Sequence, residues 1–347
     1  MKAKPHFIAA LMLALTAFAA HADEKTDSLM QAAKDNNAAE VQRLIVAGAD
    51  VNARNKYNAT ALMIAARDNS SDIAKLLIDA GANVNAKDDY NQTALMIAAG
   101  NDSVDVAKLL IEAGADVNAK SNYGDTVLMF AAWYFSADVA RLLVEAGADV
   151  SAKNDYGTTA LMFTTFRDSA YVAKLLLMVG ADANAKDNEG KTALMYAAQY
   201  KSADMARLLI AAGADAEAKN NEGITALMFA AGNNSADVAE LLIAAGADVN
   251  AKSDDGTTAL MVAAATKSSD VAALLIESGA DANAKDNDGV TVLIFATYRD
   301  ADDIAELLLA AGADMNATDN DGKTALMYAE EWGSPNVAEL LKAAGAR

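Results

Sequence analysis

Two acidic segments of the chain could, by residue type, bind a calcium ion. Residues 286–289 read Asp-Asn-Asp-Gly, and residues 319–322 have the same four residues. A calcium loop of the helix–loop–helix type also needs an acid two residues before this segment and a Glu at its twelfth position. In the first segment those positions hold Ala284 and Phe295, and the second segment departs at the same two positions. We therefore interpret both segments as turns and predict no metal site.

The chain lacks the residue types that most other catalytic and metal sites require. It has no cysteine and two histidines, His6 and His21, which both precede the signal-cleavage site predicted below. The mature chain would therefore have no cysteine nucleophile, no histidine base and no zinc site built from these residues. Catalysis by carboxylates alone would need two acids in one pocket, whereas regular turns distribute acids along a surface. We predict a protein that is not an enzyme and that uses no cofactor.

The N-terminus has the features of a secretory signal peptide. Two lysines precede an apolar run at residues 7–20, and residues 20–22 read Ala-His-Ala, the small-x-small pattern of a cleavage site. We predict cleavage near Ala22, which leaves residues 23–347 as one domain that is periplasmic or secreted. The alternative is an uncleaved anchor, but the run is shorter than the roughly 20 residues of a spanning helix. No membrane insertion is expected after cleavage.

The formal net charge of −20 restricts the expected partners. An acidic surface repels the phosphates of nucleic acids and of anionic membranes, so we expect no nucleic acid as a partner. A protein that is basic, or that offers an exposed apolar segment, is compatible with this charge.

A repeat of 33 residues runs through the chain and determines its architecture. A Gly-Ala pair and a leucine recur at this interval without insertion or deletion, from Gly48 and Leu29 to Gly345 and Leu326. The helix pairs are predicted to begin near residues 27, 60, 93, 126, 159, 192, 225, 258, 291 and 324. One unit cannot bury its own apolar stripe, so neighbouring units must stack to form a continuous core.

Each unit is predicted to form two short helices. In the third unit Thr93 occupies an N-cap position, and the strong helix formers of residues 94–99 follow it. Ser103 is predicted to cap a second helix whose apolar residues lie on one stripe. Gly114 is predicted to end that helix, because glycine tolerates the left-handed conformation.

The segment between units is predicted to contain a left-handed turn. One position there holds glycine in most units, as at Gly124, and asparagine at Asn58 and Asn91. Glycine and asparagine are the residues that most readily accept a positive φ angle. The predicted fold class is therefore all-α: a helix-turn-helix solenoid with short β-hairpin loops and about ten stacked 33-residue repeats.

These residues closely resemble the ankyrin repeat family. The family signature Thr-Pro-Leu-His reads Thr-Ala-Leu-Met at residues 159–162, and the leucine pair and loop of its second helix match Leu241, Leu242 and residues 246–251. Ala or Val replaces the family's Pro, and Met or Ile replaces its His, so the hydrogen bonds of that His are absent. The resemblance covers about residues 27–347. It implies an ankyrin-type protein without catalysis that binds partners along the concave face made by hairpins and first helices.

Two adjacent positions at the end of each first helix vary without a structural rule and are rich in aromatic residues in the middle repeats. Aromatic residues at the Ile64 position, such as Phe130, are assigned to the stacking core and set aside. The remaining aromatic residues, with a neighbouring arginine, form the predicted protein-binding site: Trp133, Tyr134, Phe135, Phe166, Arg167 and Tyr200. Aromatic clusters are common binding hot spots, and local packing is the alternative interpretation.

The turn tips carry a second signal, because one position changes from tyrosine to acid along the chain. The tyrosines are Tyr57, Tyr90, Tyr123 and Tyr156, and the acids are Glu189, Glu222, Asp255, Asp288 and Asp321. We expect a groove that accepts an apolar segment at one end and a basic segment at the other, and include the tyrosines in the predicted site. The alternative is a ladder of tyrosines that pack on their neighbours.

The sequence therefore predicts a non-catalytic, protein-binding scaffold in the periplasm or secreted. Two alternatives share the same repeat and signal. One is a general structural or chaperone-like protein of the envelope, with broad binding. The other is a secreted effector that binds a host protein.

Overall fold

The computed structural model describes residue 25 and residues 27–166 and 169–346. The predicted signal peptide, residues 1–22, lies outside them, and so does Arg167. The chain divides into two compact units, residues up to Asp155 (unit 1) and residues from Tyr156 onward (unit 2). No helix in the described residues combines the length and the apolar character needed to cross a membrane.

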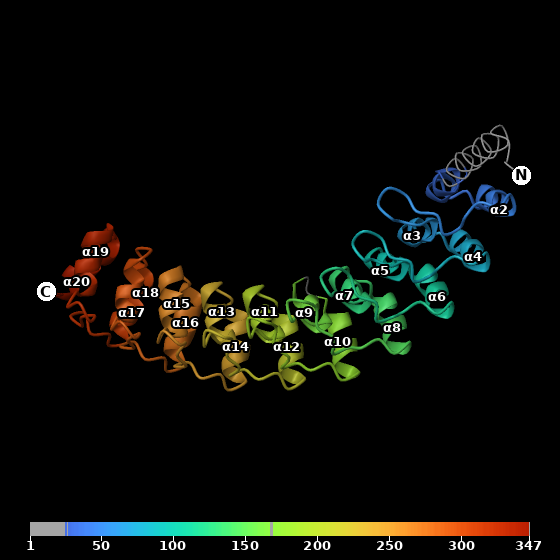
Figure 1. The fold of residues 1–347 in the computed structure, drawn as a ribbon. Helices are drawn as coiled ribbons and strands as arrows, with labels where there is room; N and C mark the ends of the chain where they lie inside the picture. The colour runs from blue at the N-terminus through green and yellow to red at the C-terminus, as the bar shows by residue number, and fades with distance from the viewer. Residues whose placement is uncertain (1–24, 26, 167–168, 347) are drawn as a thin grey trace, which may run out of the picture. The chain divides into compact units, whose positions relative to one another are not determined.

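Unit 1 is a series of helix pairs in which first helices pack on first helices and second helices on second helices (Figure 1). Its first helices include α3 (Ala61–Arg67), α5 (Ala94–Gly100) and α7 (Val127–Trp133), and residues 27–34 are also helical. Its second helices are α2 (Ala38–Val46), α4 (Ser71–Asp79), α6 (Val104–Glu112) and α8 (Ala137–Glu145).

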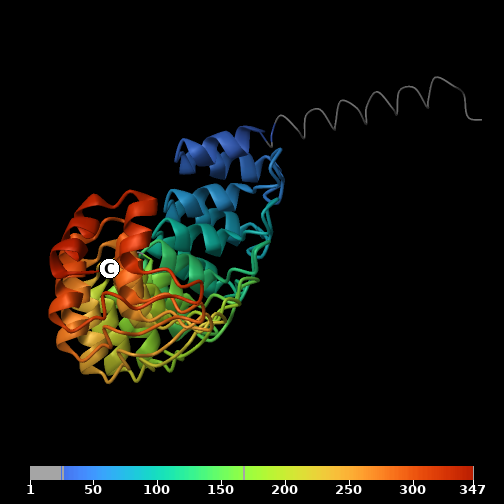
Figure 2. The same cartoon turned by 90° about the vertical axis from the view of Figure 1, so that its left-hand side faces the viewer.

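Unit 2 has the same two rows of helices, and Figure 2 shows its turns gathered on one side of them. Its first helices are α9 (Ala160–Thr165), α11 (Ala193–Gln199), α13 (Ala226–Gly232), α15 (Ala259–Thr266), α17 (Val292–Thr297) and α19 (Ala325–Trp332). Its second helices are α10 (Ala170–Met178), α12 (Ala203–Ala211), α14 (Ala236–Ala244), α16 (Ser269–Glu277), α18 (Asp302–Ala310) and α20 (Pro335–Ala344). Consecutive helix pairs of this kind confirm the predicted all-α solenoid class.

The first helices are buried on several sides because their sequences are apolar throughout. In α5 the hydroxyl of Thr93 accepts a hydrogen bond from the N–H of Met96 at 3.3 Å, which confirms the predicted cap. Ala98 and Ala99 are fully buried, and their small side chains let neighbouring first helices approach closely. Helices this short are unstable in isolation, so packing between repeats stabilises them.

The second helices bury one face and expose the other. In α6, Val106, Ala107 and Leu110 are fully buried, which confirms the predicted stripe. Gly114 follows this helix with a φ angle of 83°, so the predicted left-handed end is also confirmed.

The prediction that serines cap the second helices is wrong for Ser103. It stands at the N-cap position of α6, but its side chain accepts no hydrogen bond from the helix. The equivalent Ser136 is buried, and its hydroxyl donates to the carbonyl of Ala99 in the preceding repeat at 2.6 Å. The hydroxyl of Ser136 therefore joins two repeats, whereas the hydroxyl of the equivalent Ser202 accepts from the N–H of Met205 at 3.3 Å and caps its own helix.

The turns between repeats have the predicted left-handed residue but not fully formed hairpins. Gly124 has a φ angle of 75°. The described residues contain no strand, and the turn around Gly124 closes through a single antiparallel bridge between Lys120 and Thr126. Other backbone groups of the turn bond to the neighbouring repeat, as where the N–H of Asp155 donates to the carbonyl of Tyr123 at 3.0 Å.

Polar side chains connect successive turns of unit 2. The side-chain oxygen of Asn250 accepts from the N–H of Asp281 at 2.8 Å, and its amide donates to the carbonyl of Gly279 at 3.2 Å. The ammonium group of Lys219 donates to the carbonyl of Lys252 at 2.7 Å. The recurring Asn and Lys of these loops therefore hold the stack together, which explains why they vary so little along the chain.

Candidate functional site

The aromatic residues predicted in unit 1 lie together at the end of α7. Trp133 ends the helix, and Tyr134 and Phe135 follow it, with 51% and 47% of their surfaces exposed. The ring of Tyr134 lies 6.5 Å from the ring of Phe130 in a stacked arrangement, and it also covers Gly100 of the preceding repeat. Tyr134 thus packs locally and also leaves about half of its surface exposed, so the two interpretations of this residue are not exclusive.

Phe135 has an unusual backbone conformation. Its φ angle is 63°, and the same repeat position is left-handed at Asn69, Asp102 and Asn234. A bulky aromatic residue rarely occupies this region, and the left-handed conformation costs a residue other than glycine about 1–2 kcal/mol. The left-handed conformation therefore belongs to the fold at this position rather than to Phe135 alone, and the assignment of Phe135 to a binding site stays a prediction.

The predicted residues of unit 2 meet at the ends of α9 and α11. The ring of Phe166 lies 4.9 Å from that of Tyr196 and 5.2 Å from that of Tyr200. Tyr200 remains 47% exposed, whereas Phe166 is half-buried. Burial and a hydrogen bond to Asp187 raise the pKa of the Tyr196 hydroxyl, so this residue is held neutral in the cluster. Phe166 therefore packs at the centre of the cluster, and Tyr200 remains partly exposed to solvent.

The tip tyrosines are exposed and do not form a ladder in unit 1. Tyr57, Tyr90 and Tyr123 are 57%, 61% and 57% exposed, and no ring contact joins these three side chains in the described structure. The ammonium group of Lys56 lies 4.8 Å from the centre of the Tyr57 ring. Tyr156, in unit 2, is exposed as well. The rings of Tyr57, Tyr90 and Tyr123 thus offer most of their surface to solvent, and the assignment of the four tyrosines to a binding site stays a prediction.

A second aromatic cluster of unit 2 was not part of the predicted site. The ring of Trp332 stacks at 4.5 Å on that of Tyr298 and lies 4.5 Å from that of Tyr328. Phe295 extends the cluster, with its ring 5.8 Å from that of Tyr298. Tyr298 and Trp332 occupy the two variable positions at the ends of their first helices, so the signal was visible in the sequence although it lay outside the aromatic-rich middle repeats.

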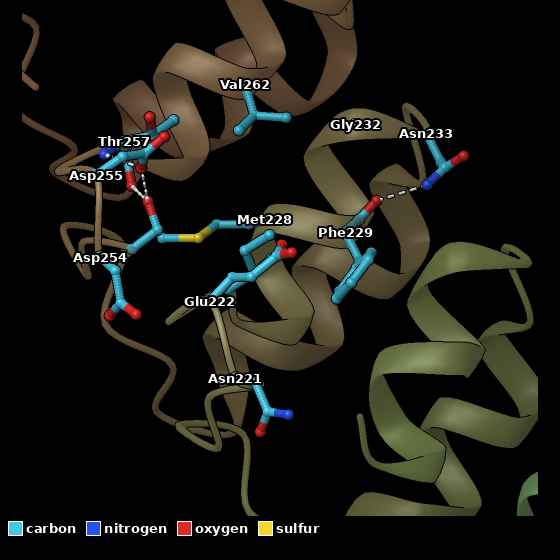
Figure 3. Close-up of a pocket in the computed structure, with 12 residues that line it drawn as sticks. Asn221, Glu222, Met228, Phe229, Gly232, Asn233, Asp254, Asp255, Thr257 and Val262 are labelled. Carbon is cyan, nitrogen blue, oxygen red and sulfur yellow. Dashed lines mark hydrogen bonds between the residues drawn. The ribbon is translucent and has the colours of Figure 1, made fainter. Parts of the chain in front are cut away.

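Between these two clusters lies an open hollow of about 590 Å³, formed by α13, α15 and the turns that precede them (Figure 3). Ile224, Met228, Phe229 and Val262 supply its apolar lining, and Gly232 leaves one side without a side chain. We call this site the α13–α15 hollow. Pockets that bind ligands commonly have volumes of about 300–1,000 Å³, and this hollow lies within that range.

The hollow corrects the assignment of the Ile64 position to the stacking core. Ile64 itself is buried, but the equivalent Phe229 and Val262 are half-buried and line the hollow. At the next variable position, Gly232 replaces the bulky side chains of the middle repeats. The sequence therefore contained a signal for the hollow, because Gly232 is small where the equivalent Trp133 and Phe166 are aromatic. From the sequence, we did not interpret this change in size as a cavity.

Three carboxylates belong to the lining of the α13–α15 hollow: Glu222, Asp254 and Asp255. Hydrogen bonds from Ser253 and Thr257 hold the pKa of Asp255 below its usual value, so this group is ionised. The site therefore combines an apolar floor with a negatively charged rim.

The arrangement of acids does not favour carboxylate catalysis. Burial raises the pKa of Asp102 and of Asp125, but Asp102 follows α5, Asp125 lies in the turn before α7, and neither lines the hollow. Within the described part of the chain, no group of three or more acidic, His or Cys side chains could hold a metal ion. The geometry instead suits recognition of another molecule by shape and charge.

Comparison with known proteins gives one finding about the whole repeat region. A family model that describes three consecutive ankyrin repeats matches the chain in five overlapping segments: residues 29–121, 89–154, 128–220, 212–286 and 274–347. No curated protein matches the chain.

Proposed function

Because the chain belongs to the ankyrin repeat family, we propose that it is a non-catalytic scaffold that binds a partner protein along its first-helix face. In unit 2 this face consists of the ends of the first helices from α11 to α19 and the turns that precede these helices. Repeats of this family generally serve as protein-binding scaffolds, and the proposal assigns that role to a particular surface of this chain.

The observation that carries the proposal is the uneven distribution of aromatic and charged residues between the two rows of helices. The first-helix face of unit 2 exposes Tyr200, Tyr298 and Trp332 and contains the α13–α15 hollow. The second helix α10 also exposes apolar side chains, Tyr171 and Met178, whereas α12, α14, α16 and α18 expose charged side chains, such as Asp237 and Glu240 of α14. Exposed apolar surface beside a hollow is typical of interaction sites, whereas a charged helix face is typical of solvated surface.

The proposed location is the periplasm or the exterior of the cell. Its support is the N-terminal pattern of basic residues, the apolar run at residues 7–20 and Ala-His-Ala at residues 20–22. Fractionation of cells that express the chain with a C-terminal tag tests this proposal. We expect a mature form that begins near Asp23 in the exported fraction, and a full-length form retained in the cytoplasm would contradict it.

Site-specific photo-crosslinking in the native cells tests the binding face. A photoreactive phenylalanine analogue would replace Tyr200 or Tyr298 on the first-helix face, and Glu240 on α14 would carry it as the matched control. We expect one discrete adduct at the first two positions and none at the control position. Equal crosslinking at position 240 would place binding elsewhere. A smear of many unrelated adducts would instead favour a chaperone-like role with broad binding.

A further inference from the structure

We propose that the α13–α15 hollow binds a basic side chain, lysine or arginine, from an exposed segment of the partner protein. The proposal rests on the proposed binding role of the first-helix face and identifies the chemistry that one site on this face recognises. It draws on three features of unit 2: an unpaired acidic rim, an apolar floor, and a lysine of the chain itself that occupies an equivalent place nearby.

The acidic rim has no cation of its own. Glu222, Asp254 and Asp255 line the hollow, and its lining includes no Lys or Arg. Across the described residues, no ion pair within 4.0 Å joins these three carboxylates to a lysine or arginine, although such pairs form elsewhere in unit 2. A partner cation would therefore meet carboxylates that have no ion pair with a lysine or arginine of the described residues, although Asp255 accepts hydrogen bonds from Ser253 and Thr257.

The floor suits the hydrocarbon stem of a long side chain. Ile224, Met228, Phe229 and Val262 present aliphatic and aromatic surface beneath the rim, as Figure 3 shows for the side chains around Met228 and Phe229. Lysine and arginine bury their methylene groups against apolar surface while the charged end stays near polar groups. The ring of Phe229 adds an aromatic face that attracts a cation.

The chain contains an internal example of this interaction one repeat earlier. The ammonium group of Lys191 lies 2.8 Å from the carboxylate of the tip residue Glu189 and 5.5 Å from the centre of the Phe229 ring. It also lies 5.7 Å from the ring of Tyr196. A tip acid and the Phe229 ring together thus hold a lysine ammonium group at this surface.

The α13–α15 hollow presents the same combination without the lysine. Ile224 occupies the position of Lys191 in the next repeat, and Thr257 occupies it in the repeat after that. The tip acids Glu222 and Asp255 are nevertheless retained at the positions equivalent to Glu189. Phe229 lines both this hollow and the neighbouring hollow that contains Lys191. The ligand that completes the hollow therefore needs the chemistry that Lys191 supplies in the preceding repeat.

Methyl NMR of the mature protein tests the proposal, because Ile224, Met228 and Val262 provide methyl signals inside the hollow. The probes are three blocked tripeptides with alanine on both sides of a central lysine, arginine or norleucine. We expect the two basic tripeptides to shift these three signals in a saturable manner, and the norleucine tripeptide, which keeps the stem but lacks the charge, to shift them much less. The relative affinities of lysine and arginine then identify the preferred head group.

Two variants address the rim and the volume separately. Glu222→Gln combined with Asp255→Asn should weaken binding of the lysine tripeptide about tenfold, because it removes two of the three charges that attract the cation. Ile224→Lys supplies the cation from within the chain, as Lys191 does, and should abolish binding. The control, Glu240→Gln with Glu306→Gln, removes the same charge from second helices and should leave affinity unchanged within about twofold.

The outcomes separate this proposal from the proposed function. Equal shifts from the norleucine and lysine tripeptides, or equal loss in the rim variant and its control, would overturn the assignment of a basic ligand. The basic tripeptides could fail to bind while crosslinking at Tyr200 and Tyr298 still captures one partner. In that case the hollow does not bind a basic side chain, but the proposed scaffold function is retained. If crosslinking also fails on this face, both proposals are wrong.

Discussion

Gly256 and Gly246 of unit 2 differ in the space available for a side chain, and substitution of each by alanine would measure the effect of this difference on stability. Both have left-handed backbones, with φ angles of 85° and 95°. A Cβ atom on Gly246 would meet no atom within 4 Å. A Cβ atom on Gly256 would lie 2.6 Å from the side-chain oxygen of Asn287 and 2.8 Å from its backbone nitrogen, in the next turn. The pair therefore separates backbone strain from contact between repeats.

The expected magnitudes follow from these contacts. Gly246→Ala should cost about 1–2 kcal/mol, the strain of a left-handed residue with a side chain. Gly256→Ala carries the same strain and must also displace Asn287, since atoms normally approach no closer than about 3.5 Å. Asn287 donates to the carbonyls of Asp255 and Asp254 at 3.0 and 2.9 Å. Loss of these two bonds, at about 1 kcal/mol each, gives a total of about 3–4 kcal/mol.

Urea denaturation of the two variants measures the difference in free energy of unfolding, and hydrogen exchange locates it. We expect Gly256→Ala to be less stable than Gly246→Ala by about 2 kcal/mol, with lost protection of the Asn287 amide. Equal stability of the two variants, or full protection of that amide in Gly256→Ala, would refute the view that Gly256 is needed for close packing of successive turns.

Three further predictions concern single side chains. Phe135→Asn should raise the free energy of unfolding by about 1 kcal/mol, measured by urea denaturation, because asparagine accepts the left-handed conformation more readily; a lower stability would argue against strain at this residue. Thr225→Ala should lower the free energy of unfolding by about 1 kcal/mol, since the threonine hydroxyl caps α13 by accepting from the N–H of Met228. An unchanged free energy of unfolding would show that this cap does not stabilise the protein. A hydrogen bond to Asp319 raises the pKa of Tyr328 to about 12. Because the folded pKa exceeds the unfolded value near 10, the contribution of Tyr328 to stability is complete below pH 10 and is lost as the pH rises toward 12. The difference in thermal midpoint between wild type and Tyr328→Phe should shrink over that range, and a constant difference would contradict it.

The regular features of the fold could be predicted because they repeat. Thr93, Gly114 and Gly124 perform in the structure the roles that their residue types indicate, since a cap or a left-handed turn depends on atoms a few residues away along the chain. The role of Ser103 could not be predicted in this way. Serine at that position is buried between repeats, so its hydrogen bonding depends on which backbone groups the neighbouring repeat brings near it.

The sequence alone also marked the aromatic residues at the ends of the first helices, because they break an otherwise regular pattern. It did not distinguish packed from exposed members of the set. Phe166 is held among other rings, whereas Tyr200 beside it exposes 47% of its surface. Exposure depends on the shape of the whole cluster, which residue type does not determine.

The 33-residue period determined the helix pairs, their order of stacking and the membership of the ankyrin family, because each repeat carries its own local signals. Only the tertiary structure decided where the surface is hollow. Gly100 and Gly232 occupy the same repeat position, yet the ring of Tyr134 lies over Gly100, with 3.6 Å from its nearest atom to a Cβ placed there. Gly232 faces the smaller Val262 of the following repeat, and the space beside it stays open. A missing side chain leaves a cavity only when nothing from the adjacent repeat fills it, and that depends on packing between repeats.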